Sequence, residues 1–589
     1  MIIFASRVMR LSTVEMVRDE ISSIWQTFGT PSQIIIWTPQ DAPPGYYLLV
    51  GLWRSLVGIH PVVIRLLPVF AFMIVSALLY RITAELVGTT AAFITIAVCA
   101  AINYIIVLGS MMRYYGVEIM LILLAWWLML RYFRRSSLLR AVLLGVCLAA
   151  MFYIHVTTVF VMVFMGGYSL ITFGWAIRKW WKPLLVTIPL VVPVILAENR
   201  TASGQFSLGT YLFFSKGQVL LNRGFAEQWN SMLGDYTGGH LELWLVLLTI
   251  ATFVILLNYG LQRRVLGILL WMFAIILLVP TAIFFAYQSR QVAWVLPGFA
   301  LWIGWGFSRL PRSAIAAVLA ICIVLMFGDA NYATNGQVSG PLVVTFSWLS
   351  QHVQTGDAVL VDPLFTTIHA EEWDYFSRAY FPNGINYVTE PVPVRRLWYF
   401  YGDGQQDPML LSQVENHRML TEQFDAQYGG YSTFRVRLYE APPDINGVAF
   451  ANGMHFYGLE SITPNVTAPI PVWNRTETIH LRLWWSADEP IQNDYSLALY
   501  VNNSKGTRVI QLDGPPQPAN GPSQTSQWTT GRYYLDEKNI ELPQDLPGFT
   551  DYTVVMTVYQ WWDNQRISAP GLTDDKLLKV FEFHVRGFG

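Results

Sequence analysis

The chain alternates between long apolar runs and short polar connections from residue 61 to residue 331. A membrane-spanning helix needs about 20 predominantly apolar residues, and each of these runs comes near that length. The pattern therefore predicts a polytopic α-helical membrane region. The expected spans lie near residues 61–85, 89–108, 116–132, 139–155, 157–177, 183–198, 241–258, 265–287, 291–308 and 312–331.

The segment before these spans is less regular. Residues 1–10 are apolar but too short to cross a bilayer, and we expect them to be the end of an incomplete first membrane helix. In the stretch WTPQDAPPGYYLLVGLW, Pro43 and Pro44 favour the start of a helix. The apolar part that follows ends near residue 57. It is too short to span, so we expect it to lie along the membrane interface.

Four connections between the spans are rich in arginine and lysine. With the spans above, all four lie on the same side of the membrane, and short basic loops typically face the cytoplasm. The sequence therefore predicts a multi-pass protein of the inner or plasma membrane, with the chain after residue 331 on the extracytoplasmic side. The basic residues are Arg131, Arg134, Arg135, Arg140, Arg178, Lys179, Lys182, Arg263, Arg264, Arg309 and Arg312.

The chain changes character after the last apolar run. The stretch VVTFSWLSQHVQTGDAVLVD has the pattern of a helix, a glycine turn and a strand, and residues 341–440 are expected to form a small extracytoplasmic α/β unit. Residues 445–589 contain strand-like runs such as HLRLWWSA and YTVVMTVYQWW between turn residues, which is typical of a β-sandwich. The expected domains are therefore a multi-span region over 1–335, the α/β unit and the β-sandwich.

Tryptophans in the strand-like runs allow two interpretations. Trp484, Trp485, Trp561 and Trp562 either pack in the core of the sandwich or stack on sugars at its surface. The sandwich pattern favours core packing for all four.

Composition narrows the classes of function. Only 13% of the residues are charged, whereas about a quarter are charged in soluble proteins, and the net charge of −1 argues against a nucleic-acid partner. Cys99, Cys147 and Cys322 lie in apolar runs, so they predict neither a disulfide framework nor a cysteine metal site. The sequence shows no metal-ligand spacing and no glycine-rich phosphate loop. It therefore suggests no cofactor and no nucleotide-sugar donor, and it leaves a divalent metal open.

An acidic pair precedes the apolar region. Asp19 and Glu20 lie in the short amphipathic stretch RLSTVEMVRDEISS. A carboxylate at this boundary can serve as a base if one substrate is a lipid and the other is soluble. The plainer interpretation is the solvated face of a helix.

Several short motifs follow one another over residues 1–331. They are Asp19–Glu20, then Asp41 with Pro43, Pro44, Tyr46 and Tyr47, then Arg65–Leu66 with Pro68, then Arg113 with Tyr115, then Tyr153 with His155, and finally Arg290 with Pro297. In this order and spacing the chain resembles the GT-C glycosyltransferases, specifically the protein O-mannosyltransferase and aminoarabinose-transferase group. These are integral membrane enzymes that use polyprenyl-phosphate sugars. The strand-rich region also resembles an accessory domain fused to some bacterial members.

The resemblance implies an inverting transferase that moves a sugar from a polyprenyl phosphate to an extracytoplasmic protein, lipid or cell-envelope glycan. One displacement needs one base; the resemblance implies Asp19 for this role, with Glu20 as the second choice. The substrate-binding residues that it implies are Asp41, Arg113, Tyr115, His155 and Arg290.

Each of the implied binding residues has a plainer alternative. Arg113 and Arg290 either hold the lipid-linked phosphate with a forked guanidinium or snorkel at the membrane boundary. His155 either orients a substrate or is a satisfied interfacial residue. Asp41 either lines the acceptor groove or caps the helix that follows it.

One departure from the family pattern keeps a second function open. Many members carry an acidic residue shortly before the loop arginine, and Met111 stands at that place here. The alternative is a non-catalytic membrane scaffold whose β-sandwich binds glycan or a partner protein. The sequence leaves the sugar, the acceptor and the oligomeric state open.

Overall fold

The chain divides into two compact units, each assembled from segments that are not contiguous in sequence. The helical unit comprises Met1–His352, Thr366–Gly384 and Ala426–Phe434, and the β-rich unit comprises Val353–Phe365, Ile385–Asp425 and Arg435–Gly589. The computed structural model describes residues 1–9, 11, 16–37, 43–155, 157–201, 233–234, 236–273, 289–327, 341–402, 407–426, 434–461 and 470–586.

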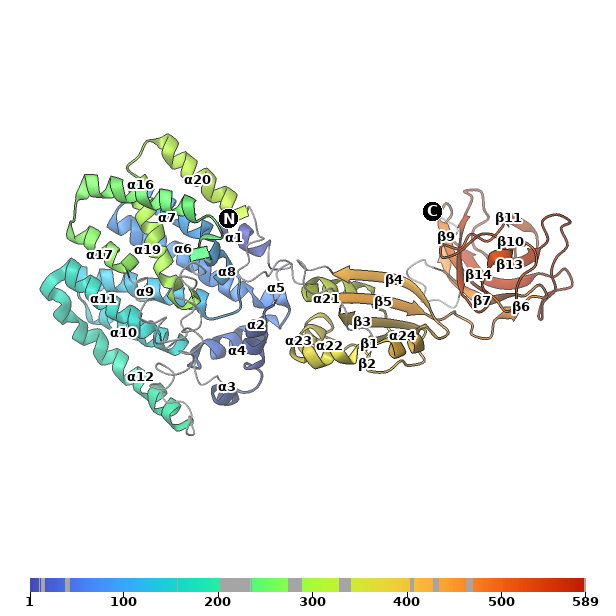
Figure 1. Ribbon diagram of the computed structural model, residues 1–589, viewed down its shortest axis with the longest axis horizontal. Coiled ribbons are helices and arrows are strands. Elements are labelled where there is room, and N and C mark those ends of the chain that lie inside the picture. Colours follow the sequence, from blue (N-terminus) through green and yellow to red (C-terminus); the bar gives the residue numbers. More distant parts are fainter. Residues whose placement is uncertain are drawn as a thin grey trace. The chain divides into compact units, whose positions relative to one another are not determined.

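Helices make up most of the helical unit (Figure 1). They are α1 (Ile2–Val8), α2 (Arg18–Trp25), α3 (Pro31–Trp37), α4 (Gly45–Val57), α5 (Pro61–Ile64), α6 (Leu66–Leu86), α7 (Thr89–Ala101), α8 (Asn103–Leu108), α9 (Tyr115–Arg134), α10 (Leu138–Ile154), α11 (Thr158–Phe173), η1 (Gly174–Trp180), α12 (Trp181–Thr201), α16 (Leu241–Tyr259), α17 (Arg263–Phe273), η3 (Ser289–Val295), α19 (Leu296–Phe307) and α20 (Arg312–Phe327).

Each expected span overlaps one or more of these helices. Among the described residues, four helical stretches are long and apolar enough to cross a membrane, namely Pro61–Leu86, Tyr115–Arg134, Thr158–Pro193 and Leu241–Tyr259. The expected span 89–108 is not one continuous helix, because the backbone of Ile102 is extended (φ −64°, ψ 117°) and separates α7 from α8. Residues 274–287 of the expected span 265–287 lie outside the described residues.

Small residues let α19 pack closely between two neighbouring helices. A Cβ atom added at Gly304 would lie 2.9 Å from the carbonyl oxygen of Ala91 in α7. One added at Gly306 would lie 2.9 Å from the carbonyl oxygen of Ala251 in α16. Close backbone approach through small residues is the usual way that helices associate in a membrane, and it makes α19 a central helix of the unit.

Basic residues gather at the C-terminal end of α6. At its C-terminal end, Glu85 forms ion pairs with Arg131 (3.1 Å) and Arg134 (2.8 Å), and Arg264 donates a hydrogen bond to the carbonyl oxygen of Leu86 (2.8 Å). Basic residues from two of the connections expected to share one side therefore meet at this end. The 21 residues of α6 rise about 31 Å, close to the thickness of the hydrocarbon core of a bilayer.

A five-stranded sheet opens the β-rich unit. The strand order is β2-β1-β3-β5-β4, and β1 pairs in parallel with both β2 and β3. The four residues of β1 are all buried. The bounds are β1 (Ala358–Val361), β2 (Tyr387–Val388), β3 (Arg396–Gly402), β4 (Met419–Ala426), β5 (Phe434–Glu440), α22 (Pro363–Ile368) and α24 (Pro408–Glu415).

Two helices near this sheet in sequence belong to the helical unit instead. They are α21 (Pro341–His352) and α23 (Ala370–Tyr380). The two helices pack on each other through stacked rings of Phe346 and Phe376, whose centroids are 5.4 Å apart. The contacts therefore divide the chain differently from the expected boundary between 335 and 341.

The strands after residue 445 form two sheets around one core. One sheet has the order β11-β10-β13-β14-β8 and the other β12-β9-β7-β6. Their inward-facing side chains form one apolar cluster, so the expected β-sandwich is confirmed. The strands are β6 (Val448–Ala449), β7 (Met454–Ser461), β8 (Val472–Trp473), β9 (Thr478–Ala487), β10 (Ser496–Asn503), β11 (Arg508–Gly514), β12 (Tyr534–Glu541), β13 (Thr550–Tyr559) and β14 (Leu578–Val585).

The four tryptophans singled out in the sequence separate into two pairs. Trp484 and Trp485 are fully buried, as core packing predicts. Trp561 and Trp562 are 63% and 47% exposed, so the expectation of core packing is wrong for them. They follow the last residue of β13, where the alternation of the strand no longer decides which side chains face the core.

A buried ionic cluster lies within the β-rich unit. The carboxylate of Glu440 is only 2% exposed and pairs with Arg396 at 2.8 Å and with Arg482 at 3.0 Å. Arg482 also contacts Glu460 at 3.2 Å. Burial by itself would raise the pKa of Glu440. The Thr421 hydroxyl and the two guanidinium groups outweigh burial and hold this pKa below its ordinary value.

Candidate active site

The acidic pair begins a short helix. Asp19 and Glu20 occupy the first turn of α2, where the helix dipole favours negative charge. The carboxylate of Glu20 accepts a hydrogen bond from the backbone N–H of Val17, the residue that precedes the helix, at 3.2 Å. This bond satisfies a donor that the helix leaves free, so the sequence fixes the start of α2 locally.

Glu20 is held in a buried cage of donors. Arg65 donates from Nε to Oε1 at 3.0 Å and from a terminal nitrogen to Oε2 at 2.7 Å. The backbone N–H of Met112 donates to Oε1 as well. The side chains of Glu20 and Arg65 are 1% and 2% exposed. The geometry therefore suits Glu20 to hold α2, the start of α6 and the Met112 loop together, and it does not suit it to accept a proton from a substrate.

Asp19 has the opposite environment. Its side chain is 50% exposed, and its Oδ2 lies 3.9 Å from a terminal nitrogen of Arg113. The same guanidinium donates to the backbone carbonyl oxygen of Asp19 at 3.1 Å and to the hydroxyl of Ser23 at 2.6 Å. Asp19 thus keeps an accessible carboxylate beside a cation that is anchored to its own helix.

A group of tyrosines lies next to Arg113. Gly45 brings α4 against the end of α10, because a Cβ there would lie 2.6 Å from the carbonyl oxygen of Tyr153. This approach places Tyr46 edge-on to Tyr114, with ring centroids 6.1 Å apart. The ring of Tyr115 is 4.3 Å from that of Tyr114.

His155 closes this group from the end of α10. Its ring stacks on Tyr114 with centroids 4.3 Å apart and an interplanar angle of 16°. Nδ1 forms a 2.5 Å hydrogen bond with the hydroxyl of Thr157, and the side chain is 2% exposed. His155 therefore packs on one face of the Tyr114 ring, and its buried side chain leaves little exposed surface that a ligand could contact.

Helix α23 packs against the helix that carries the acidic pair. The hydroxyl of Tyr375 donates to the backbone carbonyl oxygen of Ile59 at 2.7 Å, and its ring lies edge-on to Trp25 of α2. Arg18 of α2 pairs with Glu371 at 3.2 Å. A segment far along the chain therefore helps to hold α2 in place.

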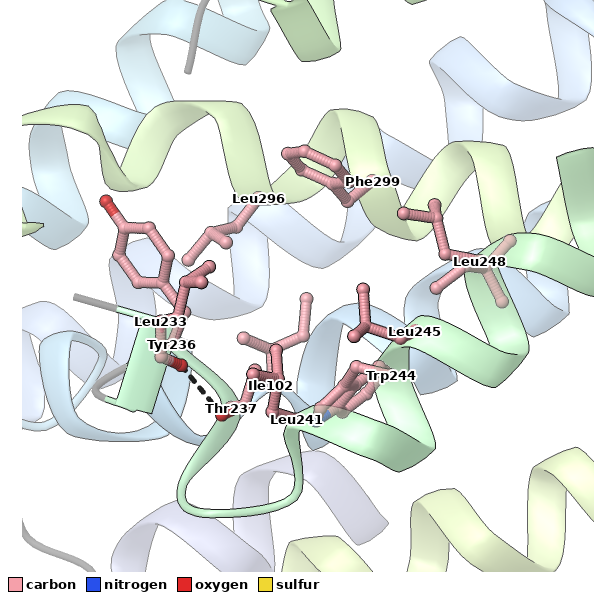
Figure 2. Close-up of a pocket in the computed structure, with 11 residues that line it drawn as sticks. Ile102, Leu233, Tyr236, Thr237, Leu241, Trp244, Leu245, Leu248, Leu296 and Phe299 are labelled. Carbon is pink, nitrogen blue, oxygen red and sulfur yellow. Dashed lines mark hydrogen bonds between the residues drawn. The ribbon is translucent and has the colours of Figure 1, made fainter. Parts of the chain in front are cut away.

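An apolar pocket lies elsewhere in the helical unit (Figure 2). Its volume is about 120 Å³. The hydroxyl of Thr237, which faces the pocket, already donates a hydrogen bond to the carbonyl oxygen of Leu233 at 2.7 Å. The pocket therefore suits an apolar segment of a ligand. It is lined by Ile102, Leu233, Tyr236, Thr237, Leu241, Trp244, Leu245, Leu248, Leu296, Phe299 and Ile303.

The structure brings together most of the residues that the sequence singled out. Those that meet around Arg113 are Asp19, Glu20, Tyr115 and His155. Asp41 lies outside the described residues, and of Arg290 only the backbone, in η3, is described.

Sequence reasoning left several members of the site unassigned. Arg65 belongs to the R-L-x-P motif, but only the fold shows that it pairs with Glu20. Tyr46 belongs to the motif that begins at Asp41, but no role was assigned to it, and Tyr114 lies between the two residues of the R-x-Y motif, which is the signal that could have marked it.

Comparison with known proteins identifies a relationship over part of the chain. Residues 41–196 match the model of the family described as dolichyl-phosphate-mannose-protein mannosyltransferase. The chain resembles the GT-C membrane glycosyltransferases, as its motifs predicted. The match covers α4, the tyrosine group, Arg113 and His155, but not the acidic pair. No curated protein matches the chain.

Solved structures of membrane transferases are also similar to the chain. ArnT from Cupriavidus metallidurans in the apo state is 11% identical with a TM-score of 0.47, over 74% of this chain and 95% of that one. Arabinofuranosyltransferase AftD from Mycobacteria is 13% identical with a TM-score of 0.38, over 99% of this chain and 59% of that one. Arabinosyltransferase EmbB from Mycobacterium smegmatis is 11% identical with a TM-score of 0.36, over 98% of this chain and 64% of that one.

Proposed function

We propose that this chain is an inverting membrane glycosyltransferase that transfers a sugar from a polyprenyl-phosphate donor to an extracytoplasmic acceptor. The observation that carries the proposal is the difference in environment between the two residues of the acidic pair. Asp19 is half exposed beside Arg113, whereas Glu20 is buried and neutralised by Arg65. The family match over residues 41–196 supports the same class of reaction.

The proposed step is a single displacement at the anomeric carbon. The hydroxyl oxygen of the acceptor forms a bond to that carbon while the bond from the carbon to the phosphate oxygen breaks. The polyprenyl phosphate leaves with the bonding electron pair, and Asp19 takes the proton of the acceptor hydroxyl. Because one displacement occurs, the configuration of the sugar inverts. The proposed step includes no cofactor and leaves a divalent metal open.

Arg113 is the proposed partner of the donor phosphate. Its Nε is buried and makes no hydrogen bond within the described part of the chain. A guanidinium fixed beside the base can stabilise the negative charge that develops on the leaving phosphate. Asp41 and Arg290 are proposed as further binding residues, on the strength of the motifs alone.

The proposed setting is the inner or plasma membrane, with the β-rich unit on the extracytoplasmic side. The basic connections that gather near Glu85 support a cytoplasmic location for that end of α6. The start of α6, with Arg65 and Glu20, then faces outward. The proposed acceptors are a protein, a lipid or a cell-envelope glycan.

The test is a transfer assay in membranes that contain the full chain. Radiolabelled polyprenyl-phosphate hexoses and pentoses serve as donors, and the label is followed into protein, lipid and glycan fractions. We expect Asp19→Asn to lower transfer by about 100-fold or more, while Glu242→Gln, an exposed acid of α16, leaves it unchanged. Full transfer by Asp19→Asn would remove the base assignment. Absence of transfer by the wild-type chain with every donor would favour the scaffold alternative.

A further inference from the structure

Glu118 is an acidic residue that the proposed displacement does not use. It lies in the first turn of α9 and is 3% exposed. Its Oε1 has no hydrogen-bond partner among the residues that the structure describes. An unpartnered carboxyl oxygen in an apolar helix is costly, so its presence calls for a function.

Glu118 is not alone in lacking a partner. The hydroxyl of Tyr46, a residue that is 1% exposed, and Nε of Arg113 are also buried without a hydrogen bond in the described part of the chain. Buried polar atoms in folded proteins nearly always have a partner. A polar ligand can supply the partners that these three atoms lack.

Tyr114 is a neighbour of all three residues that carry these atoms. Tyr114 directly follows Arg113, its ring lies edge-on to Tyr46, and its carbonyl oxygen accepts the backbone N–H of Glu118 at 2.8 Å. His155 covers a face of this ring. The unpartnered atoms thus belong to Tyr46, whose ring contacts Tyr114, and to Glu118, which lies one helical turn after Tyr114 in α9. Tyr114 itself follows Arg113, the guanidinium that neighbours Asp19.

The chemistry of these groups discriminates between ligands. A phosphate offers only acceptors and negative charge, so it suits Arg113 and not a carboxyl group. A sugar carries hydroxyl groups that both donate and accept, so it satisfies a carboxyl oxygen and a phenol together. We propose that Glu118 and Tyr46 form the subsite that binds hydroxyl groups of the transferred sugar. This inference rests on the proposed glycosyl transfer and adds the residues that recognise the sugar.

Substitutions that remove only the polar atoms test the subsite. Glu118→Leu replaces the carboxyl group with an apolar side chain of similar size, and Tyr46→Phe removes a single oxygen. Both variants should unfold at a temperature equal to or above that of the wild type, because an unpartnered buried polar group has been removed. Both should lower kcat/KM for the sugar donor by about 10- to 100-fold. A structural role would instead lower the unfolding temperature.

Two further variants sharpen the comparison. Glu118→Gln keeps one accepting oxygen and should recover part of the activity that Glu118→Leu loses. Tyr80→Phe, a matched removal of a phenol oxygen on α6 outside the site, should leave kcat/KM unchanged. Equal activity of Glu118→Leu, Tyr46→Phe and the wild type would overturn the inference, because neither polar atom would then contact the sugar.

Monodeoxy donors identify the contact itself. The probes are the polyprenyl-phosphate sugar that the wild-type chain transfers and its derivatives that each lack one hydroxyl group. Removal of one particular hydroxyl should cost the wild type about tenfold or more and should cost Glu118→Leu little, because the partner is already gone. Losses that add independently for every hydroxyl would overturn the inference and leave the transfer reaction standing. A wild-type chain that transfers no donor would overturn the proposed function first.

Discussion

Arg65 holds Glu20 through two parallel hydrogen bonds of 3.0 and 2.7 Å, in a site where both side chains are almost fully buried. The two residues are 45 positions apart in sequence. This bond uses one carboxylate of the acidic pair for architecture and leaves its neighbour Asp19 to face the solvent and Arg113.

Breaking this pair on one side should destabilise the helical unit. Glu20→Gln or Arg65→Met leaves an uncompensated buried charge, which typically costs about 3–5 kcal/mol. Thermal unfolding in detergent should show a clear loss for both single variants. The matched control Asp19→Asn should unfold like the wild type, because its carboxylate is half exposed. Unchanged unfolding of Glu20→Gln would contradict the role of the pair.

Arg113 should not be replaceable by lysine. One terminal nitrogen donates to both the Asp19 carbonyl oxygen and the Ser23 hydroxyl, while the other faces the Asp19 carboxylate. A single ammonium cannot reproduce this fork. We expect Arg113→Lys to reduce transfer strongly and Ser23→Ala, which removes only one acceptor, to reduce it weakly. Equal transfer by Arg113→Lys and the wild type would exclude a specific guanidinium contact.

The contact between α23 and α2 should depend on Tyr375 and not on the exposed ion pair. Tyr375 is fully buried, and aromatic-to-alanine changes at such sites cost about 3–5 kcal/mol. Tyr375→Ala should therefore lower the unfolding temperature and also reduce transfer. Glu371→Gln should change neither, since its partner Arg18 is largely exposed. The opposite ranking of the two variants would show that α23 does not support α2 through packing.

The β-rich unit should lose stability in acid through Glu440. Its folded-state pKa is lowered by the Thr421 hydroxyl and by Arg482 and Arg396, although burial opposes this shift. The stabilisation is therefore present above the pKa of an unfolded glutamate, about 4.3, and is lost as the pH falls through the lower folded-state pKa.

Glu440→Gln should be less stable at pH 7 by about 3 kcal/mol and should lack this part of the acid dependence. Thermal unfolding followed by tryptophan fluorescence from pH 7 downward measures it, since Trp484 donates to Glu460 within the same cluster at 3.1 Å. Glu541→Gln, at an exposed position of β12, is the matched control. Identical pH profiles of Glu440→Gln and the wild type would contradict the prediction.

Reporter fusions should place the basic connections and the β-rich unit on opposite sides of the membrane. A fusion after Arg135 should give a cytoplasmic signal, because Arg131 and Arg134 belong to a basic connection and pair with Glu85 at the C-terminal end of α6. A fusion at the C-terminus should give an extracytoplasmic signal. Signals from the same compartment would reject the proposed orientation.

The positions of the helices follow from the sequence by itself. Long apolar runs exclude an aqueous setting, and backbone groups in lipid must satisfy their hydrogen bonds internally, so such runs become helices. Because successive spans alternate in direction and short basic loops face the cytoplasm, the basic connections could also be grouped before the fold was known. The motifs also selected Asp19, Arg113, Tyr115 and His155, which the fold brings together.

Only the tertiary structure decided what each of these residues does. Asp19 and Glu20 are adjacent and chemically alike, and nothing local distinguishes them. The distinction comes from Arg65 and from the backbone N–H of Met112, which lie 45 and 92 positions away. The same holds for the contact of α23 with α2 and for the unpartnered carboxyl oxygen of Glu118. Burial and hydrogen bonding between distant segments set the environment of a charge, and a linear pattern records the charge but not that environment.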